Sequence, residues 1–264
     1  MPFSPSIRQT EPTMNFTRRT LFGIAPFACL QVRAADPAPA LAPTFPAQPP
    51  ELAREMVSVS HGNIQRVREL VKAQPALAKA SWDWGFGDWE TALGAASHVG
   101  NREIAELLIA AGAPPTLFSA AMLGQLDVVK ALIAGNPGAQ RIAGPHSISL
   151  LAHAKNGGEA SKAVYQYLDS LGDAGAPPMA PLTEEQLNSI AGTYVFGDAS
   201  NQRIEITIVR GQPQFTRSGA VARQLFHLGD LAFHPAGSRA VRITFSGNTL
   251  TVYDPGAVLT ARKL

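Results

Sequence analysis

The chain has almost no cysteine. Its 264 residues include one, Cys29, in an N-terminal stretch that we expect to be removed during export. The remaining chain would then hold no thiol, which excludes disulfides, cysteine-ligated zinc sites and a cysteine nucleophile. A long hydrophobic run is also missing, because the apolar segment Leu21–Val32 is too short to cross a bilayer.

A marked excess of charge of one sign is absent as well. The formal net charge is +2 at pH 7, and residues 1–34 hold four arginines and one glutamate. The rest of the chain carries 18 basic side chains (22 less four) and 19 acidic ones (20 less one), a net charge of −1. A nearly neutral product gives no electrostatic reason to bind nucleic acid or an anionic membrane. With 45% hydrophobic residues, the composition fits a soluble globular protein of one or two domains.

The N-terminus carries the features of an export signal. Arg18 and Arg19 precede the apolar run, and a small-residue site follows it at Ala34, which is the order of a secretory signal. The segment Thr17–Phe22, TRRTLF, resembles the twin-arginine signal, which implies export of a folded protein to the bacterial periplasm. An ordinary secretory signal is the alternative. We expect a periplasmic or secreted protein after cleavage near Ala34.

A pattern of two short helices around a glycine occurs twice between Glu90 and Ile133. Small and apolar residues precede the glycine, and apolar residues at helical spacing follow it. The first copy consists of Leu93, Ala95, Ala96, Gly100, Ile104, Leu107 and Leu108, and the second of Ala120, Ala121, Gly124, Val128, Val129 and Leu132. We predict that Val128, Val129 and Leu132 share one packed face.

This pattern resembles the ankyrin repeat, whose family motif is TPLHxAAxxG followed by a second helix. Thr91, Leu93, Ala96 and Gly100 match the motif, and Gly94 stands where the family has histidine. Similar patterns over residues 51–77 and 144–171 complete four repeats. The resemblance implies a helical array that acts as a binding surface, with its partner in the concave groove.

The spacing between the first two repeat glycines is longer than the ankyrin period, and the extra residues fall in the segment that holds every tryptophan. Gly62 and Gly100 are 38 residues apart, against about 33 in the family, and the surplus falls at residues 78–88. The segment Ser81–Trp89, which we call the aromatic finger, contains Trp82, Trp84 and Trp89. Tryptophan dominates binding hot spots because it buries a large area. Packing over the array is the alternative role, and we expect Trp84 to be the exposed contact and Trp89 to be structural.

The last third of the chain changes from helical to alternating periodicity. Ile204, Ile206 and Ile208 alternate with polar residues, and Gly247-Asn248 offers a turn between two further strands. We predict an antiparallel sheet of seven or eight strands. The layout resembles the small lipocalin-like barrel appended to beta-lactamase-like serine hydrolases. That resemblance implies a barrel without the catalytic domain it often accompanies.

The predicted fold class is therefore an α+β multidomain protein, a helical repeat array followed by a small antiparallel β-barrel. The parts are a signal over 1–34, a Pro/Ala-rich linker over 35–50, the ankyrin-like domain over 51–172, a second linker over 173–181 and the barrel over 182–264.

No familiar catalytic motif is present. The chain has no SxxK, GxSxG or HExxH sequence and no Walker loop. No two histidines are spaced at i, i+3 or i+4, so none presents a ready metal face on one helix. The histidines are His61, His98, His146, His153, His227 and His234. We predict a protein that is not an enzyme and has no cofactor or metal ion, with zinc held between repeats as the alternative.

We predict an exported binding protein that holds a protein or peptide partner. The residues expected to contact the partner are Trp82, Trp84, Asp88, Trp89, His98, Val99, Met122, Leu123 and His146. Two alternatives remain. The barrel interior could carry a small apolar ligand against four phenylalanines, Phe215, Phe226, Phe233 and Phe245. The chain could instead be a hydrolase with an unfamiliar site built from Asp88, His98 and His153.

The arginine pair provides a test of the export route. Replacing Arg18 and Arg19 with lysine should block export, because the resemblance implies that the guanidinium pair is the recognised feature. Cell fractionation should find a shortened protein outside the cytoplasm for the unmodified chain only. Unchanged export of the double variant would favour the ordinary secretory route, and a full-length cytoplasmic product of the unmodified chain would contradict export itself.

Overall fold

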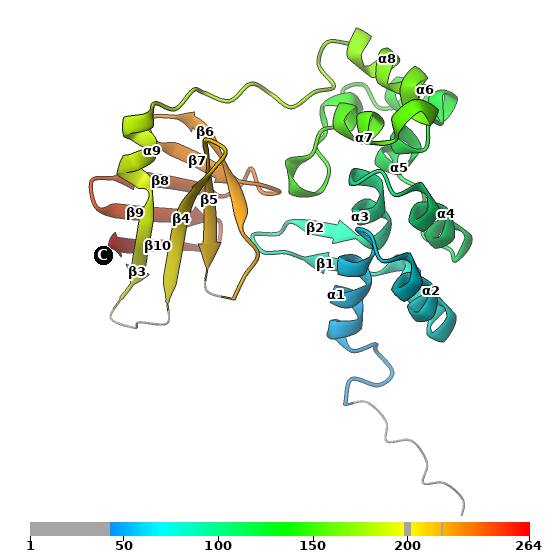
Figure 1. Cartoon of the computed structure of the whole chain (residues 1–264), viewed down its shortest axis with the longest axis horizontal. Coiled ribbons are helices and arrows are strands. Elements are labelled where there is room, and N and C mark those ends of the chain that lie inside the picture. Colours follow the sequence, from blue (N-terminus) through cyan, green and yellow to red (C-terminus); the bar gives the residue numbers. More distant parts are fainter. Residues whose placement is uncertain (1–42, 198–201, 218) are drawn as a thin grey trace, which may run out of the picture. The chain divides into compact units, whose positions relative to one another are not determined.

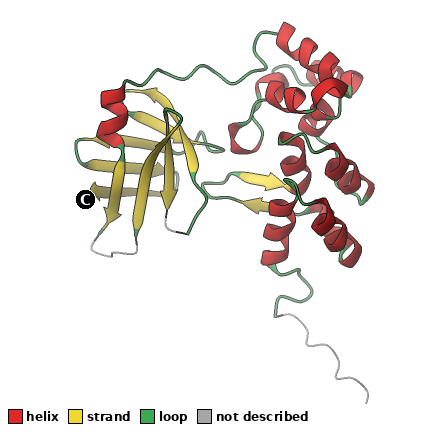
Figure 2. Ribbon diagram, viewed as in Figure 1, coloured by secondary structure: helices red, strands yellow, loops and turns green. Residues whose placement is uncertain are grey.

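The structure is a computed structural model that describes residues 43–197, 202–217 and 219–264. The predicted signal, including Arg18 and Arg19, and most of the first linker lie outside the described residues. Residues 42–264 group into one compact unit, in which helices come first and a strand-rich part follows (Figure 1; Figure 2). Within the described ranges no helix has the length and hydrophobicity to cross a bilayer.

The first part consists of short helices arranged in pairs. The pairs are α1 (Pro50–Val59) with α2 (Ile64–Ala73), α3 (Ala92–His98) with α4 (Arg102–Ala110), α5 (Leu117–Met122) with α6 (Leu126–Gly135), and α7 (Leu150–Asn156) with α8 (Lys162–Ser170). Polar side chains set where several of them begin. Thr91, Asn101 and Ser149 each accept a hydrogen bond from the backbone N–H three residues later, which satisfies a donor that a helix start leaves free.

The apolar pattern of the helices explains most of this packing. Leu93, Ile104 and Leu108 are buried in the core between α1, α3 and α4. The prediction for α6 is wrong in part, because Val129 is buried while Val128 and Leu132 are exposed. Helix α6 packs against α5 and α8, and the stripe covered by these two helices is too narrow to include all three side chains.

Glycines end the first helix of each inner pair and allow close stacking. Gly100 and Gly124 have φ angles of +79° and +74°, a conformation that costs glycine little. A Cβ on Gly100 would lie 2.1 Å from the backbone oxygen of Asn156, and one on Gly124 would lie 2.0 Å from that of Ala160. The helix pairs therefore approach one another more closely than any side chain at these turns would permit.

The second part is a closed antiparallel barrel of eight strands, which agrees with the seven or eight predicted. Its strands are β3 (Gly192–Phe196), β4 (Arg203–Val209), β5 (Gln212–Arg217), β6 (Arg223–Gly229), β7 (Ala232–Pro235), β8 (Arg242–Ser246), β9 (Thr249–Asp254) and β10 (Ala257–Lys263). Sequential strands pair, and β10 closes the barrel against β3. Ile204 and Ile206 point into the core while Glu205 is exposed, as the alternation predicted. Helix α9 (Glu184–Ile190) precedes β3.

The turn glycines provide a test of the stacking. We expect Gly100→Ala to lower the free energy of unfolding by about 2–4 kcal/mol, because alanine is strained at positive φ and would overlap the Asn156 carbonyl. Gly62→Ala is the matched control, since nothing lies within 4 Å of a Cβ at Gly62. Urea unfolding of both variants gives the comparison, and equal stability of the two would contradict the close approach.

Candidate functional site

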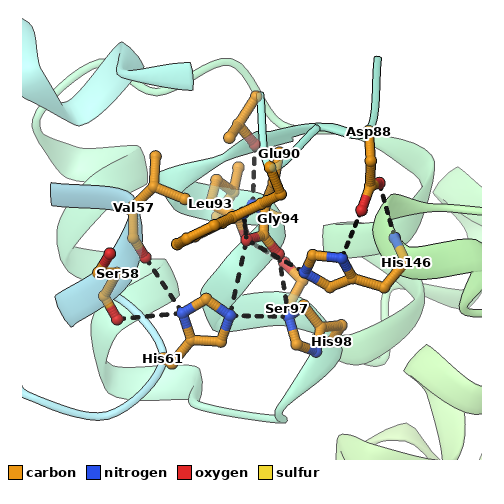
Figure 3. Close-up of polar contacts among 12 residues, drawn as sticks. Val57, Ser58, His61, Asp88, Glu90, Leu93, Gly94, Ser97, His98 and His146 are labelled. Atoms are coloured by element: carbon orange, nitrogen blue, oxygen red, sulfur yellow. Dashed lines mark hydrogen bonds and ion pairs between the residues drawn. The ribbon is translucent and has the colours of Figure 1, made fainter. Parts of the chain in front are cut away.

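The aromatic finger forms a short hairpin. Strand β1 (Ser81–Asp83) pairs antiparallel with β2 (Trp89–Thr91), with Trp82 opposite Glu90. At the tip, the Asp83 carboxylate accepts the backbone N–H of Gly85 at 2.8 Å. The hairpin places the side chains of Asp88 and Glu90, two residues apart, beside the ends of several helices (Figure 3).

Three histidines and one glutamate converge beside this hairpin (Figure 3). His61 follows α1, Glu90 lies in β2, His98 is the last residue of α3, and His146 lies in the 3-10 turn Pro145–Ser147 before α7. One nitrogen or oxygen atom of each side chain lies within 4.8 Å of the corresponding atom of every other. Nitrogen and carboxylate oxygen atoms grouped in this way are ligands that transition metals bind.

The closest contacts join Nε2 atoms and the glutamate oxygens. His61 Nε2 lies 3.1 Å from His98 Nε2, and His98 Nε2 lies 2.9 Å from Glu90 Oε1. Glu90 Oε2 lies 3.6 Å from His61 Nε2 and 3.4 Å from His146 Nε2. The indole N–H of Trp84 donates to Glu90 Oε2 at 2.7 Å, so the oxygen that faces His61 and His146 is also held by the indole.

The outer nitrogens of two histidines are held by acceptors. His61 Nδ1 lies 3.0 Å from the Ser58 carbonyl oxygen, and His146 Nδ1 lies 2.6 Å from Asp88 Oδ2. Both partners are acceptors, so Nδ1 carries the proton in each ring. In the neutral form of each ring the lone pair is then on Nε2, the atom that faces Glu90. Metal-binding histidines are oriented by the same kind of outer contact.

Asp88 and Glu90 are buried anions. Glu90 is fully buried. Burial alone would raise its pKa, but hydrogen bonds from His146 and His98 lower it to about 2. His146 responds in the opposite direction, because its contacts with Asp88 and Glu90 overcome burial and raise its pKa to about 9. The site therefore holds negative charge that either protons or a cation must balance.

Asp88 also joins the finger to the barrel. Its carboxylate accepts the backbone N–H of His146 at 2.9 Å and a hydrogen bond from the Arg223 guanidinium. Burial raises its pKa, but these hydrogen bonds outweigh burial and hold the pKa below the ordinary value. A Cβ on Gly237 would lie 2.0 Å from the Asp88 carboxylate carbon, so only glycine fits there.

His153 lies behind the cluster as a neutral, buried ring. Its Nδ1 lies 2.9 Å from the Ser149 carbonyl oxygen, and its Nε2 has no hydrogen-bond partner among the described residues. Its ring centre is 6.5 Å from that of His98. Burial lowers the pKa of His153 to about 4, and the ring stays uncharged at neutral pH.

The structure brings together four of the residues expected to contact a partner. Trp84, Asp88, His98 and His146 all belong to the cluster or touch it. The sequence placed them on one binding surface and named zinc between repeats only as an alternative, because no two histidines share a helix face.

The other expected contacts lie elsewhere. Trp82 is half-buried, with the Arg54 guanidinium 5.9 Å from its ring centre, and Leu123 is half-buried in the helical core. Met122 is fully buried, so the expectation that it faces a groove is wrong, because α5 packs into the helical core on that side. Val99 is exposed.

The roles expected for Trp84 and Trp89 are reversed. Trp89 is 64% exposed, whereas Trp84 packs against the helical core and donates to Glu90. The register of the hairpin explains this. Trp89 and Thr91 are both exposed in β2, and Glu90 between them points inward.

The four phenylalanines proposed to line the barrel interior are divided between two environments. Phe215, Phe233 and Phe245 are buried in the barrel core. Phe226 is only half-buried and stacks on His234, with ring centres 5.0 Å apart.

His61 and Glu90 were not predicted as site residues. His61 immediately precedes Gly62, and His98 lies two residues before Gly100. His61 and His98 thus lie near the turn glycines of two successive helix pairs. This repeated position could have predicted that the two histidines lie on the same edge of the stacked helices. Glu90 directly precedes Thr91, the N-cap residue of α3. A single buried carboxylate at this position produces no sequence pattern that would mark it as a site residue.

No family model matches the chain, and neither does any curated protein.

The neutral state of His153 predicts a pH dependence of stability. Its folded pKa is about 4 and its ordinary value is 6.5, so the unfolded chain binds a proton first as pH falls. The contribution of the neutral His153 ring to the free energy of unfolding is therefore complete above about pH 6.5 and is lost as pH falls toward 4. Between pH 6.5 and 5.5 the protein should lose about 1 kcal/mol more stability than His153→Asn, by urea unfolding. Parallel curves for the two proteins would contradict a buried neutral ring.

Proposed function

We propose that this protein binds a divalent transition-metal ion, with zinc the best match, through His61, Glu90, His98 and His146. The observation that carries the proposal is the convergence of four donor atoms, each within 4.8 Å of the others. The residues come from four separate segments of the chain. Such a grouping is rare by chance, because Glu90 is buried and the three histidines must lose part of their hydration to join it.

The spacing of the donors suits a small ion. Zinc ligands lie about 2.0–2.2 Å from the metal, so neighbours in a tetrahedral site are about 3.3–3.6 Å apart. The contacts of Glu90 Oε2 with His61 and His146, at 3.6 and 3.4 Å, fall in or beside that range. The His61–His98 contact of 3.1 Å is slightly shorter. Three imidazoles favour zinc, copper or nickel over magnesium and calcium, which prefer oxygen ligands.

The rival explanation is a cluster held together by protons alone. A proton on His146 balances much of the charge of Asp88 and Glu90. The contacts of His98 favour an ion instead, because its Nε2 faces both Glu90 Oε1 and His61 Nε2. One proton on that nitrogen can bond well to only one of the two neighbours, whereas an ion at the centre binds all of them.

The role we propose is binding, without a reaction. The four ligands would leave no coordination position reserved for a substrate, as in structural zinc sites. The side chains of His61 and His146 are 32% and 28% exposed, so an ion could enter from solvent. We further propose that the helix pairs form an ankyrin array and that the protein acts after export, as the sequence patterns imply.

A second candidate function is the capture of a protein or peptide partner. The large exposed surface of Trp89, with Val99 also exposed, supports it, because exposed indoles are frequent binding anchors. Trp89→Ala should then abolish the capture of a periplasmic partner in a pull-down without loss of stability. Full retention of every captured protein by this variant would remove the candidate.

Metal binding can be measured directly on the chelator-treated protein. We expect isothermal titration with Zn²⁺ to show one ion per chain. His98→Gln should weaken binding on the order of 100-fold, and Asp88→Asn about 10–100-fold because it orients His146. His227→Gln is the matched control, since that histidine lies in the barrel strand β6 and should bind as the unmodified protein does.

Thermal unfolding separates the ion from the proton network. At a free Zn²⁺ concentration about 100 times the dissociation constant, the folded state should gain about 2.7 kcal/mol. The melting temperature should rise for the unmodified protein and for His227→Gln, and not for His98→Gln. No shift in any protein, or an equal shift in all three, would overturn the proposal in favour of protons.

A further inference from the structure

The turn that carries His146 needs contacts from outside itself. His146 and the next residue, Ser147, have φ angles of +57° and +61°, a left-handed conformation that is uncommon for residues other than glycine. The Gly144 N–H closes the turn by donating to the Ile148 carbonyl oxygen at 2.8 Å. Left-handed residues of this kind persist where the surrounding structure fixes them. The position of His146, a candidate metal ligand, therefore depends on what packs against this turn.

Asp88 of the finger fixes both the backbone and the ring of His146 (Figure 3). Its Oδ1 accepts the backbone N–H of His146 at 2.9 Å, and its Oδ2 lies 2.6 Å from the ring Nδ1. Because these contacts use both oxygens of one carboxylate, a rotation of the Asp88 side chain would move or release the ring. The direction of His146 Nε2, which lies 3.4 Å from Glu90 Oε2, thus follows the direction of the Asp88 carboxylate.

The barrel holds Asp88 in that direction. The Arg223 guanidinium of β6 donates to Asp88 Oδ2 and to the Ala236 carbonyl oxygen. Arg223 is 6% exposed and Asp88 is 2% exposed. A buried, charge-assisted pair has a defined geometry and is costly to break. Arg223 therefore acts on His146 through Asp88.

The turn that follows β7, residues 236–238, contacts the same two segments. The Gly237 N–H donates to Ser147 Oγ at 2.8 Å, one residue after His146. A Cβ on Gly237 would lie 2.0 Å from the carboxylate carbon of Asp88, and the φ angle of Gly237 is +82°. The barrel backbone is therefore packed directly against Asp88, with no room for a side chain between them.

We propose that the barrel positions one ligand of the metal site: Arg223 and Gly237 hold Asp88, and Asp88 holds His146. Loss of such outer contacts typically lowers metal affinity by about 10–100-fold. By linkage, the ion strengthens the contact between the barrel and the helices by the same factor by which that contact raises the affinity. The inference rests on the proposed metal binding and goes beyond it, because all four candidate ligands precede the barrel in the chain.

The positional effect of the barrel can be separated from its charge. Arg223 brings a positive charge that by itself disfavours a cation, and the Asp88 carboxylate offsets that charge. A substitution of Arg223 would change position and charge together, whereas Gly237→Ala changes position alone. Gly211→Ala is the matched control, since Gly211 has a φ angle of +76° and nothing lies within 4 Å of a Cβ there.

The first test is isothermal titration of Zn²⁺ into the chelator-treated full chain. Gly237→Ala should bind about tenfold more weakly than the unmodified protein, or weaker still, because the added methyl group displaces Asp88. Gly211→Ala should bind as the unmodified protein does. Equal affinity of the two variants would overturn this inference and leave the metal proposal standing. Absence of binding by the unmodified protein would overturn both.

The visible spectrum of bound Co²⁺ distinguishes a displaced ligand from a general loss of stability. At saturation, the unmodified protein and Gly211→Ala should give the same absorption band. Gly237→Ala should give a shifted and weaker band, because water takes the place of the His146 nitrogen. An unchanged band in Gly237→Ala would show that His146 stays in place, and would contradict a positioning role for the barrel.

Amide hydrogen exchange tests the reverse direction on the unmodified protein, without a variant that must fold. Zn²⁺ should slow the exchange of the Gly237 N–H about tenfold or more, because the ion holds the turn that carries its acceptor, Ser147. The amides of β9, which lies between β8 and β10, are the internal control and should exchange at an unchanged rate. Equal slowing at Gly237 and in β9, or no slowing at Gly237, would overturn the inference.

Discussion

The burial of the Glu90 carboxylate is the constraint on which the site depends. An ion taken out of water is costly unless hydrogen bonds and opposite charge replace its hydration. Here the replacement comes from the indole of Trp84 and from His61, His98 and His146. Removing any of them would leave the carboxylate partly uncompensated. The ends of α1 and α3 and the turn before α7 are therefore held near one point by charge as well as by apolar packing.

The β1–β2 hairpin performs two tasks because Asp88 and Glu90 do not have the same set of partners. Glu90 points into the helices, while Asp88 contacts His146 and Arg223 of the barrel strand β6. The two carboxylates share His146, whose Nδ1 faces Asp88 and whose Nε2 faces Glu90, and each has further partners of its own. Phe86, between the two strands, contacts Phe215. A segment of about ten residues thus supplies contacts to both parts of the compact unit.

Periodic features were predictable from the sequence, and convergent ones were not. Burial within one segment produces a pattern that the segment shows by itself, as in the alternation at Ile204 and Ile206 and the helical spacing around Leu93 and around Ile104. The cluster depends on tertiary approach between segments as distant as His61 and His146, and no local pattern records it. The hairpin register, which exposes Trp89 and buries Glu90, is set by three residues on each strand, too few to show a period.

The cluster has a consequence for how the helical part unfolds. A row of stacked helix pairs is held mainly by contacts between neighbours, so such rows can open from either end a pair at a time. The contacts among His61, Glu90, His98 and His146 cross that order, since they connect the first pair to the turn before the last. Fraying of α1 removes His61 from Glu90, and opening at α7 removes His146. We therefore expect loss of either end to weaken the contacts of Glu90, and the stacked helix pairs to unfold as a single cooperative unit.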